Sequence, residues 1–156
     1  MKNILIFVIG IATTLLVGCS SLQLQPADFS WAAEEVVEVK TNGMVEAKRY
    51  SVSFNINALL SKEFAADSSA AKNTKEINLI RDKAGFYYLT GTKFKNVYVL
   101  SQSEGALSVS NTLALPAEKT VEKPVFDQKD SYIELKSGAD KYQVNKGSIQ
   151  PAGGKK

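Results

Sequence analysis

The chain has 156 residues, with 19 Lys and Arg against 16 Asp and Glu, and a formal net charge of +3. These nearly balanced charges are interspersed, and because no basic patch stands out we expect no nucleic-acid partner. The chain has no histidine and a single cysteine, which excludes Ser-His-Asp and Cys-His catalytic systems and removes the commonest metal ligand. We therefore expect no cofactor, no metal and one domain without an internal disulfide.

An apolar segment follows the basic residue Lys2 and runs from Ile4 to Val17. Its length of about 14 residues corresponds to a helix of roughly 21 Å, which is too short for a bilayer core of about 30 Å. The segment therefore predicts a secretory signal and not a transmembrane helix. The sole cysteine ends the motif Leu16-Val17-Gly18-Cys19.

This motif resembles the lipobox of bacterial lipoproteins. The resemblance implies that residues 1–18 are a signal peptide, and that Cys19 is lipidated and becomes the first residue of the mature chain. The family carries three acyl chains on this cysteine, so the membrane anchor would be effectively permanent. In the enterobacterial form of the pathway, a serine such as Ser20 permits transfer to the outer membrane. An ordinary cleaved signal that releases a soluble protein is the alternative.

The rest of the chain divides into three parts. Residues 19–30 are short and polar enough to serve as a tether of at most about 35 Å, and residues 31–149 are expected to form one β-rich domain. Trp31, the only tryptophan, is interpreted as a core residue at the start of this domain, or alternatively as a residue at the membrane interface. Residues 150–156 are predicted to be a disordered tail.

The domain begins with a predicted hairpin. A strand over 36–40 is followed by Asn42-Gly43, which supplies the positive φ angles of a tight turn. The return strand is expected to continue to Ile56, because apolar and polar residues alternate from Arg49 to that point. Next we predict a short helix over 58–64, capped by Asn57, and an exposed loop over 65–74.

Runs of β-branched and aromatic residues predict six further strands, at residues 76–81, 86–90, 96–100, 106–113, 132–136 and 141–144. Pro116 and Pro124 exclude a central strand between residues 116 and 129. The pattern favours an all-β, mainly antiparallel fold, a small β-sandwich or barrel with one short helix. A propeller is a weaker alternative, since the chain would supply only about three blades.

Few residues suggest chemistry. Ser69-Ala70-Ala71-Lys72 is similar to the serine-lysine motif of penicillin-recognising enzymes, but the S-D-N and K-T-G elements of that family are absent. Glu34-Glu35, Asp127 and Asp130 are the nearest approach to clustered carboxylates, and we expect them to lie on a solvated face. The sequence therefore does not predict an enzyme.

The most suggestive cluster interleaves aromatic residues with lysines and comprises Phe86, Tyr87, Tyr88, Lys93, Phe94, Lys95 and Tyr98. Such a surface would suit a glycan or a protein partner, whereas ordinary packing of the rings into the core is the alternative. Together these features predict a lipid-anchored, non-enzymatic binding or assembly subunit held beside an envelope protein partner. A carrier or sensor of a lipid or small apolar ligand is the alternative function.

Overall fold

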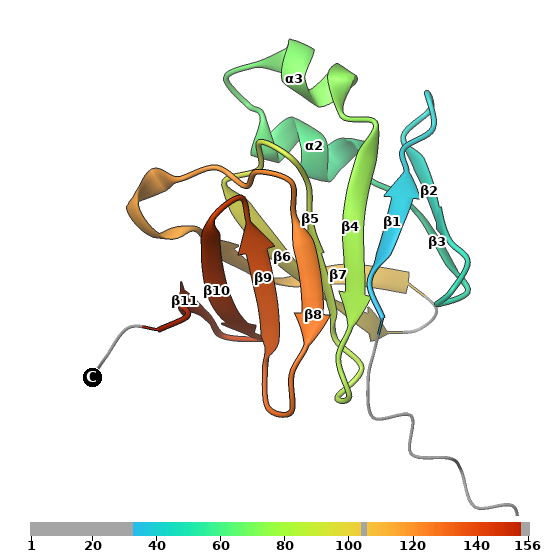
Figure 1. Ribbon diagram of the computed structural model, residues 1–156. Coiled ribbons are helices and arrows are strands. Elements are labelled where there is room, and N and C mark those ends of the chain that lie inside the picture. The colour runs from blue at the N-terminus through green and yellow to red at the C-terminus, as the bar shows by residue number, and fades with distance from the viewer. Residues whose placement is uncertain (1–32, 104–105, 154–156) are drawn as a thin grey trace, which may run out of the picture.

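The computed structural model describes residues 33–103 and 106–153. The predicted signal peptide, the predicted lipidation site Cys19, the predicted tether and Trp31 lie outside the described residues. The described part is built of antiparallel strands and two short helices (Figure 1). The prediction of an all-β, mainly antiparallel fold is thereby confirmed.

The central element is a five-stranded antiparallel sheet with the strand order β1-β4-β5-β6-β7. Its strands are β1 (Glu35–Glu38), β4 (Glu76–Arg81), β5 (Tyr87–Thr90), β6 (Asn96–Ser103) and β7 (Ala106–Ala114). The register between β6 and β7 shifts at Val99 and Leu100. Such a bulge increases the local twist of the hairpin.

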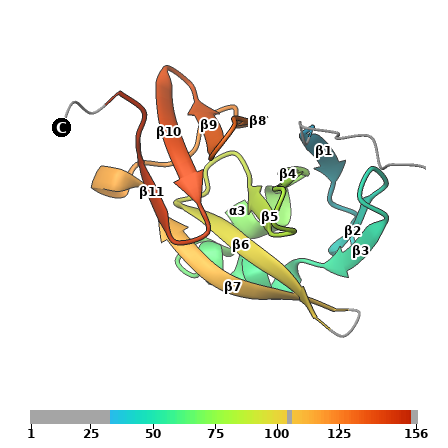
Figure 2. The ribbon, with the colours of Figure 1, turned by 90° about the horizontal axis from the view of Figure 1, so that it is seen from below.

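A four-stranded sheet lies against one face of the central sheet (Figure 2). Its strands, in the order β11-β10-β9-β8, are β8 (Val125–Gln128), β9 (Ile133–Ser137), β10 (Asp140–Asn145) and β11 (Ser148–Pro151). Two side-chain hydrogen bonds join the sheets. The Asn78 amide of β4 donates to the Pro124 carbonyl before β8 at 3.0 Å, and the Asn111 amide of the edge strand β7 donates to the Lys146 carbonyl in the turn between β10 and β11 at 3.0 Å. The result is a sandwich whose edges nearly close.

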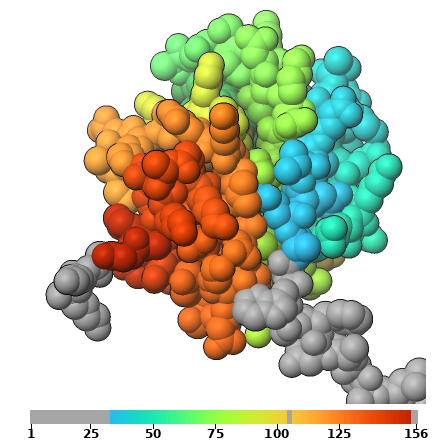
Figure 3. Space-filling view, viewed as in Figure 1, coloured from blue at the N-terminus to red at the C-terminus, as the bar shows by residue number. Residues whose placement is uncertain are grey.

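The opposite face of the central sheet is covered by a hairpin and two helices. These are the hairpin of β2 (Met44–Ala47) and β3 (Val52–Asn55) and the helices α2 (Asn57–Glu63) and α3 (Ser68–Asn73). The short helix η1 (Pro116–Glu118), between β7 and β8, lies beside β11 of the four-stranded sheet. Figure 3 shows the helices in green at one end of the molecule, with the N-terminal strands in blue beside the C-terminal sheet in orange and red. The middle of the central sheet is therefore buried on both faces, which explains the fully buried pattern of β5, whereas the edge strand β7 is mostly exposed.

The predicted N-terminal hairpin is only partly correct. The turn at Asn42-Gly43 forms, with Gly43 at φ +78°, but β1 pairs with β4 and reaches the return strand only through a single bridge from Val39 to Val45. The return strand is not continuous either. It folds back through a turn at residues 48–51 into the β2–β3 hairpin.

The predicted helix is confirmed as α2, whereas its cap is wrong by one residue. Ile56 occupies the N-cap position, and no side chain caps the helix. Asn57 instead donates from its side chain to the carbonyl of Asn42 at 3.1 Å, fixing α2 to the preceding turn. Part of the predicted loop is also helical, because Asp67 caps α3 by accepting from two backbone N–H groups.

Two strands were not predicted. β8 lies within the segment where Pro124 excluded a central strand, and it is an edge strand that pairs only with β9. β11 pairs with β10 through a turn at Asn145, whose carboxamide oxygen accepts from the N–H groups of Gly147 and Ser148. This strand reaches Pro151, into the segment where we expected the disordered tail.

Candidate functional site

The predicted aromatic–lysine surface does not form. The buried rings, each with an exposed fraction of 2% or less, belong to Tyr87, Tyr88, Phe94 and Tyr98. Phe86 is half-buried, whereas Lys93 and Lys95 are exposed. These four rings are thus packed in the core, which agrees with the alternative interpretation of this cluster. The two exposed lysines therefore do not share a stacking surface with them.

The arrangement of β5 explains this outcome. Successive side chains of a strand point to opposite faces, so a strand with one solvated face exposes every second residue. Tyr87 packs edge to face against Tyr50 of the β2–β3 turn, with 5.6 Å between ring centroids. Tyr88 points to the other face, where it lines the same hollow as Ile133 of β9. Because both faces of β5 are covered, neither tyrosine reaches the surface.

Two buried tyrosines donate to carboxylates. The hydroxyl of Tyr88 donates to Asp82 at 2.9 Å, and the hydroxyl of Tyr98 donates to Glu63 at 2.5 Å. Burial raises the pKa of each phenol well above its usual value, and the acceptor carboxylate raises it further. Both tyrosines therefore stay protonated near neutral pH, which suits structural donors and not proton-transfer groups.

Glu63 binds the end of α2 to the start of β6. One carboxylate oxygen accepts from the backbone N–H of Lys95, and the other accepts from the Asn96 amide at 2.8 Å and from the Tyr98 hydroxyl. Three donors on two oxygens leave this carboxylate fully engaged in holding the helix on the sheet.

The paired carboxylates Glu34 and Glu35 also have structural partners. Glu34 accepts from the Asn78 amide of β4 and from the backbone N–H of Phe126 in β8, each at 2.8 Å, and so joins the two sheets. Glu35 accepts from two backbone N–H groups of the β2–β3 turn at 2.8 and 3.0 Å. Neighbouring residues thus act on opposite faces of the sheet, and they do not form an acid–base pair.

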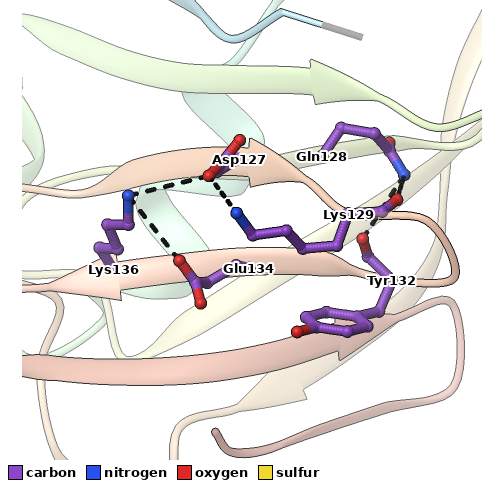
Figure 4. Close-up of polar contacts among 6 residues, drawn as sticks. All are labelled: Asp127, Gln128, Lys129, Tyr132, Glu134 and Lys136. Carbon is purple, nitrogen blue, oxygen red and sulfur yellow. Dashed lines mark hydrogen bonds and ion pairs between the residues drawn. The ribbon is translucent and has the colours of Figure 1, made fainter. Parts of the chain in front are cut away.

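The outer face of β8 and β9 carries a charged cluster (Figure 4). Asp127 and Glu134 lie directly opposite each other in the register of the two strands. Lys129 contacts Asp127 at 2.6 Å, and Lys136 lies 3.8 Å from Asp127 and 3.7 Å from Glu134. The hydrogen bond from Lys129 lowers the pKa of Asp127. The lysines offset the repulsion between the opposed carboxylates, as expected of a partly solvated charged face.

The remaining candidates are not assembled into a catalytic site. Asp130 is highly exposed and lies 3.9 Å from Lys83 in another loop. The hydroxyl of Ser69 donates to Asp67 at 2.6 Å, and Ser69 and Lys72 line different hollows on the two sides of α3. Within residues 33–103 and 106–153, no group of three or more acidic side chains could hold a metal ion.

A surface feature that the sequence did not predict is an apolar groove of about 290 Å³ between α2 and the β6–β7 hairpin. We call it the α2–β7 groove. It is lined by Phe54, Asn55, Ile56, Ala58, Leu59, Lys62, Tyr98, Leu100, Leu107 and Val109. All of these except Asn55 and Lys62 are apolar or aromatic. Val109 has an exposed fraction of 48%, so the groove presents apolar surface to solvent.

The α2–β7 groove adjoins the first half of the edge strand β7, whereas the second half contacts the turn between β10 and β11 through Asn111. β7 ends the order of its sheet, with β6 as its hydrogen-bonded neighbour. An edge strand offers backbone N–H and C=O groups to an incoming strand. Sequence patterning located both α2 and β7, but it could not show that α2 stops short of covering the β6–β7 hairpin. The position of α2 relative to the β6–β7 hairpin depends on tertiary packing, which no local sequence pattern indicates.

In the described part of the chain, no helix has the length and apolar character needed to cross a bilayer. Comparisons with protein-family models, with curated proteins and with solved structures each find no match.

Proposed function

We propose that the chain is a lipid-anchored envelope protein of the outer membrane that acts as a non-enzymatic binding or assembly subunit. The N-terminal lipid on Cys19 would hold it at the membrane, and a second envelope protein would dock in the α2–β7 groove. The observation that carries this proposal is the exposed apolar lining of the groove beside the first half of β7, which ends the strand order of its sheet.

The chemistry of the groove favours a protein partner. Leu107 and Val109 lie two residues apart on β7, so their side chains point to the same face. A strand from a partner that pairs with β7 would bring alternate apolar side chains over this lining, with backbone hydrogen bonds adding affinity. Lys62 at the rim adds a positive charge for an acidic residue at the border of the partner's surface.

Anchoring suits such a role, because confinement to one membrane surface raises the effective concentration of a weak partner. A groove of this size would otherwise support only a modest affinity, since stable protein interfaces bury more than about 1,000 Å² in total. The membrane anchor would therefore compensate for the modest affinity of the small groove.

The carboxylates support a binding role over an enzymatic one. Glu34, Glu35 and Glu63 accept hydrogen bonds from backbone or amide donors that hold elements together. A catalytic carboxylate pair needs free oxygens aimed at a shared substrate. Carriage of a lipid or apolar ligand inside the domain has less support, because the described core is packed with fully buried side chains such as Ile77 and Leu89.

The test is site-specific photo-crosslinking in cells, with the photoreactive residue in place of Val109. The matched control places it at Val36, whose exposed fraction of 54% is similar but which lies on β1, at the other end of the strand order. We expect one envelope protein to be captured from position 109 and not from position 36. Equal capture from both positions, or none from 109, would contradict docking in the groove.

A further inference from the structure

A second hollow, separate from the α2–β7 groove, lies between α2, α3 and the turn that joins β1 to β2. Its volume is about 530 Å³, within the range of about 300–1,000 Å³ that is usual for small-molecule sites. We call it the α2–α3 cleft. The helices and this turn lie at the same end of the molecule in Figure 1.

The floor of the α2–α3 cleft is apolar. Leu60 on α2 is buried, with an exposed fraction of 4%, and Phe64 and Ala71 are half-buried and pack against the core. These three side chains, with Val39, offer a surface for the apolar part of a ligand. No residue of α3 is fully buried, and Ala71 and Lys72 of this helix are part of the lining of the cleft.

Two walls of the cleft, α2 and the turn between β1 and β2, are held together by hydrogen bonds. The Asn57 amide of α2 donates to the Asn42 carbonyl of the turn at 3.1 Å, and the backbone N–H of Ile56 donates to the Gly43 carbonyl at 2.9 Å. Gly43 has φ +78°, and a Cβ atom there would lie 2.1 Å from the Asn57 carboxamide oxygen. A preformed cleft loses less entropy on binding than one that must be ordered by the ligand.

The rim carries only positive charge. Lys40, Lys72 and Lys75 line the cleft, and no Asp or Glu is part of its lining. Lys40 pairs with Glu46 outside the cleft, whereas Lys72 and Lys75 form no ion pair with any described residue. Two uncompensated ammonium groups beside an apolar floor form a surface complementary to an anion with an apolar body.

We propose that the α2–α3 cleft binds a small amphiphile with an anionic oxygen head group. The apolar body would lie on Leu60, Phe64 and Ala71, and the head would contact the amines of Lys72 and Lys75. A carboxylate and a phosphate share this chemistry. The site is independent of the protein partner proposed above, so either proposal can fail without the other.

The test is photolabelling of the full chain in cell membranes with octanoate that carries a diazirine, followed by mapping of the labelled peptide by mass spectrometry. We expect label within residues 57–75. Octanoate and octyl phosphate serve as competitors, and the stronger one identifies the head group. Octanol has the same apolar body without the charge, and we expect it to compete poorly.

Two kinds of variant test the lysine charges and the apolar floor of the cleft separately. We expect Lys72→Gln with Lys75→Gln to lower labelling about tenfold, which corresponds to about 1.4 kcal/mol for the loss of two partly screened ion pairs. The control pair Lys123→Gln with Lys141→Gln removes two exposed lysines that are not in the lining, and it should label as the wild type does. Ala71→Phe keeps the charges but fills the floor, and should also abolish labelling.

Three outcomes would each overturn the proposal. They are competition by octanol equal to that by the anions, equal labelling of the two lysine double variants, and the absence of label between residues 57 and 75.

Discussion

Glu63 offers the sharpest test of how the fold is held, because one carboxylate binds three donors. Glu63→Ala leaves the Tyr98 hydroxyl, in a side chain with an exposed fraction of 1%, without its acceptor, and it also releases the amide of Asn96 and a backbone N–H. A hydrogen bond to a charged group contributes about 1.5–3 kcal/mol. Since bonds within one network are not additive, we expect a loss of about 2–4 kcal/mol in the free energy of unfolding.

The assay is urea unfolding followed by far-UV circular dichroism. Glu63→Gln should lose less, because its single carbonyl oxygen can still accept from Asn96 and Tyr98, while its NH₂ group opposes the N–H of Lys95. The matched control is Glu38→Ala, which truncates an exposed glutamate of β1 and should change stability by no more than about 0.5 kcal/mol. A loss in Glu63→Ala no larger than in Glu38→Ala would refute the structural role of this carboxylate.

Three further outcomes follow from other contacts. Glu34→Ala leaves a buried backbone N–H of β8 unpaired, so we expect about 1–3 kcal/mol less stability in urea; unchanged stability would contradict its role in joining the sheets. Gly43→Ala places a Cβ atom 2.1 Å from Asn57 at φ +78°, so thermal unfolding should show a loss of about 1–3 kcal/mol, and an unchanged Tm would show that the turn adapts. Burial, and then the hydrogen bond to Glu63, raise the pKa of Tyr98 in the folded state. Its stabilising contribution is therefore complete below pH about 10 and falls by about 1.4 kcal/mol per pH unit above it. In the Tyr98→Phe variant, the free energy of unfolding should therefore fall less steeply as the pH rises above about 10 than in the wild type. The same pH dependence in both proteins would contradict this reasoning.

The sequence was informative where a local pattern determines the structure. Strand β4 was predicted with its observed bounds, and β5, β6 and β7 were located to within a few residues, because runs of β-branched and aromatic residues mark strands in any context. The turn at Gly43 was also predicted from a local signal, because glycine adopts positive φ angles more readily than other residues. These elements suffice for the fold class.

Relations between distant segments were not predictable. Nothing near β1 in the sequence shows that it pairs with β4 and not with β2, because its partner residues, such as Leu79 opposite Glu35, lie far along the chain. The burial of both Tyr87 and Tyr88 likewise depends on two layers contributed by other segments. Helix α3 did have a local signal, an Asp67 cap before an alanine-rich stretch, but the absence of large apolar residues favoured a loop.

The candidate site was the least predictable part. The aromatic–lysine cluster was conspicuous in the sequence because aromatic residues stand beside lysines, yet proximity along a strand does not place side chains on one face. The α2–β7 groove combines residues of β3, α2, β6 and β7, and its apolar surface is exposed because no further element of the described chain covers it.

The measurement that tests the account most directly is photo-crosslinking from position 109 in the otherwise wild-type chain and in the Cys19→Ala variant, at equal expression. We expect one protein to be recovered in near-stoichiometric amount from the wild-type background and lost from Cys19→Ala, because the variant would no longer be confined to the membrane of its partner. The same partner at the same yield in both backgrounds would contradict the role of the anchor. No captured protein in either background would contradict the binding role itself.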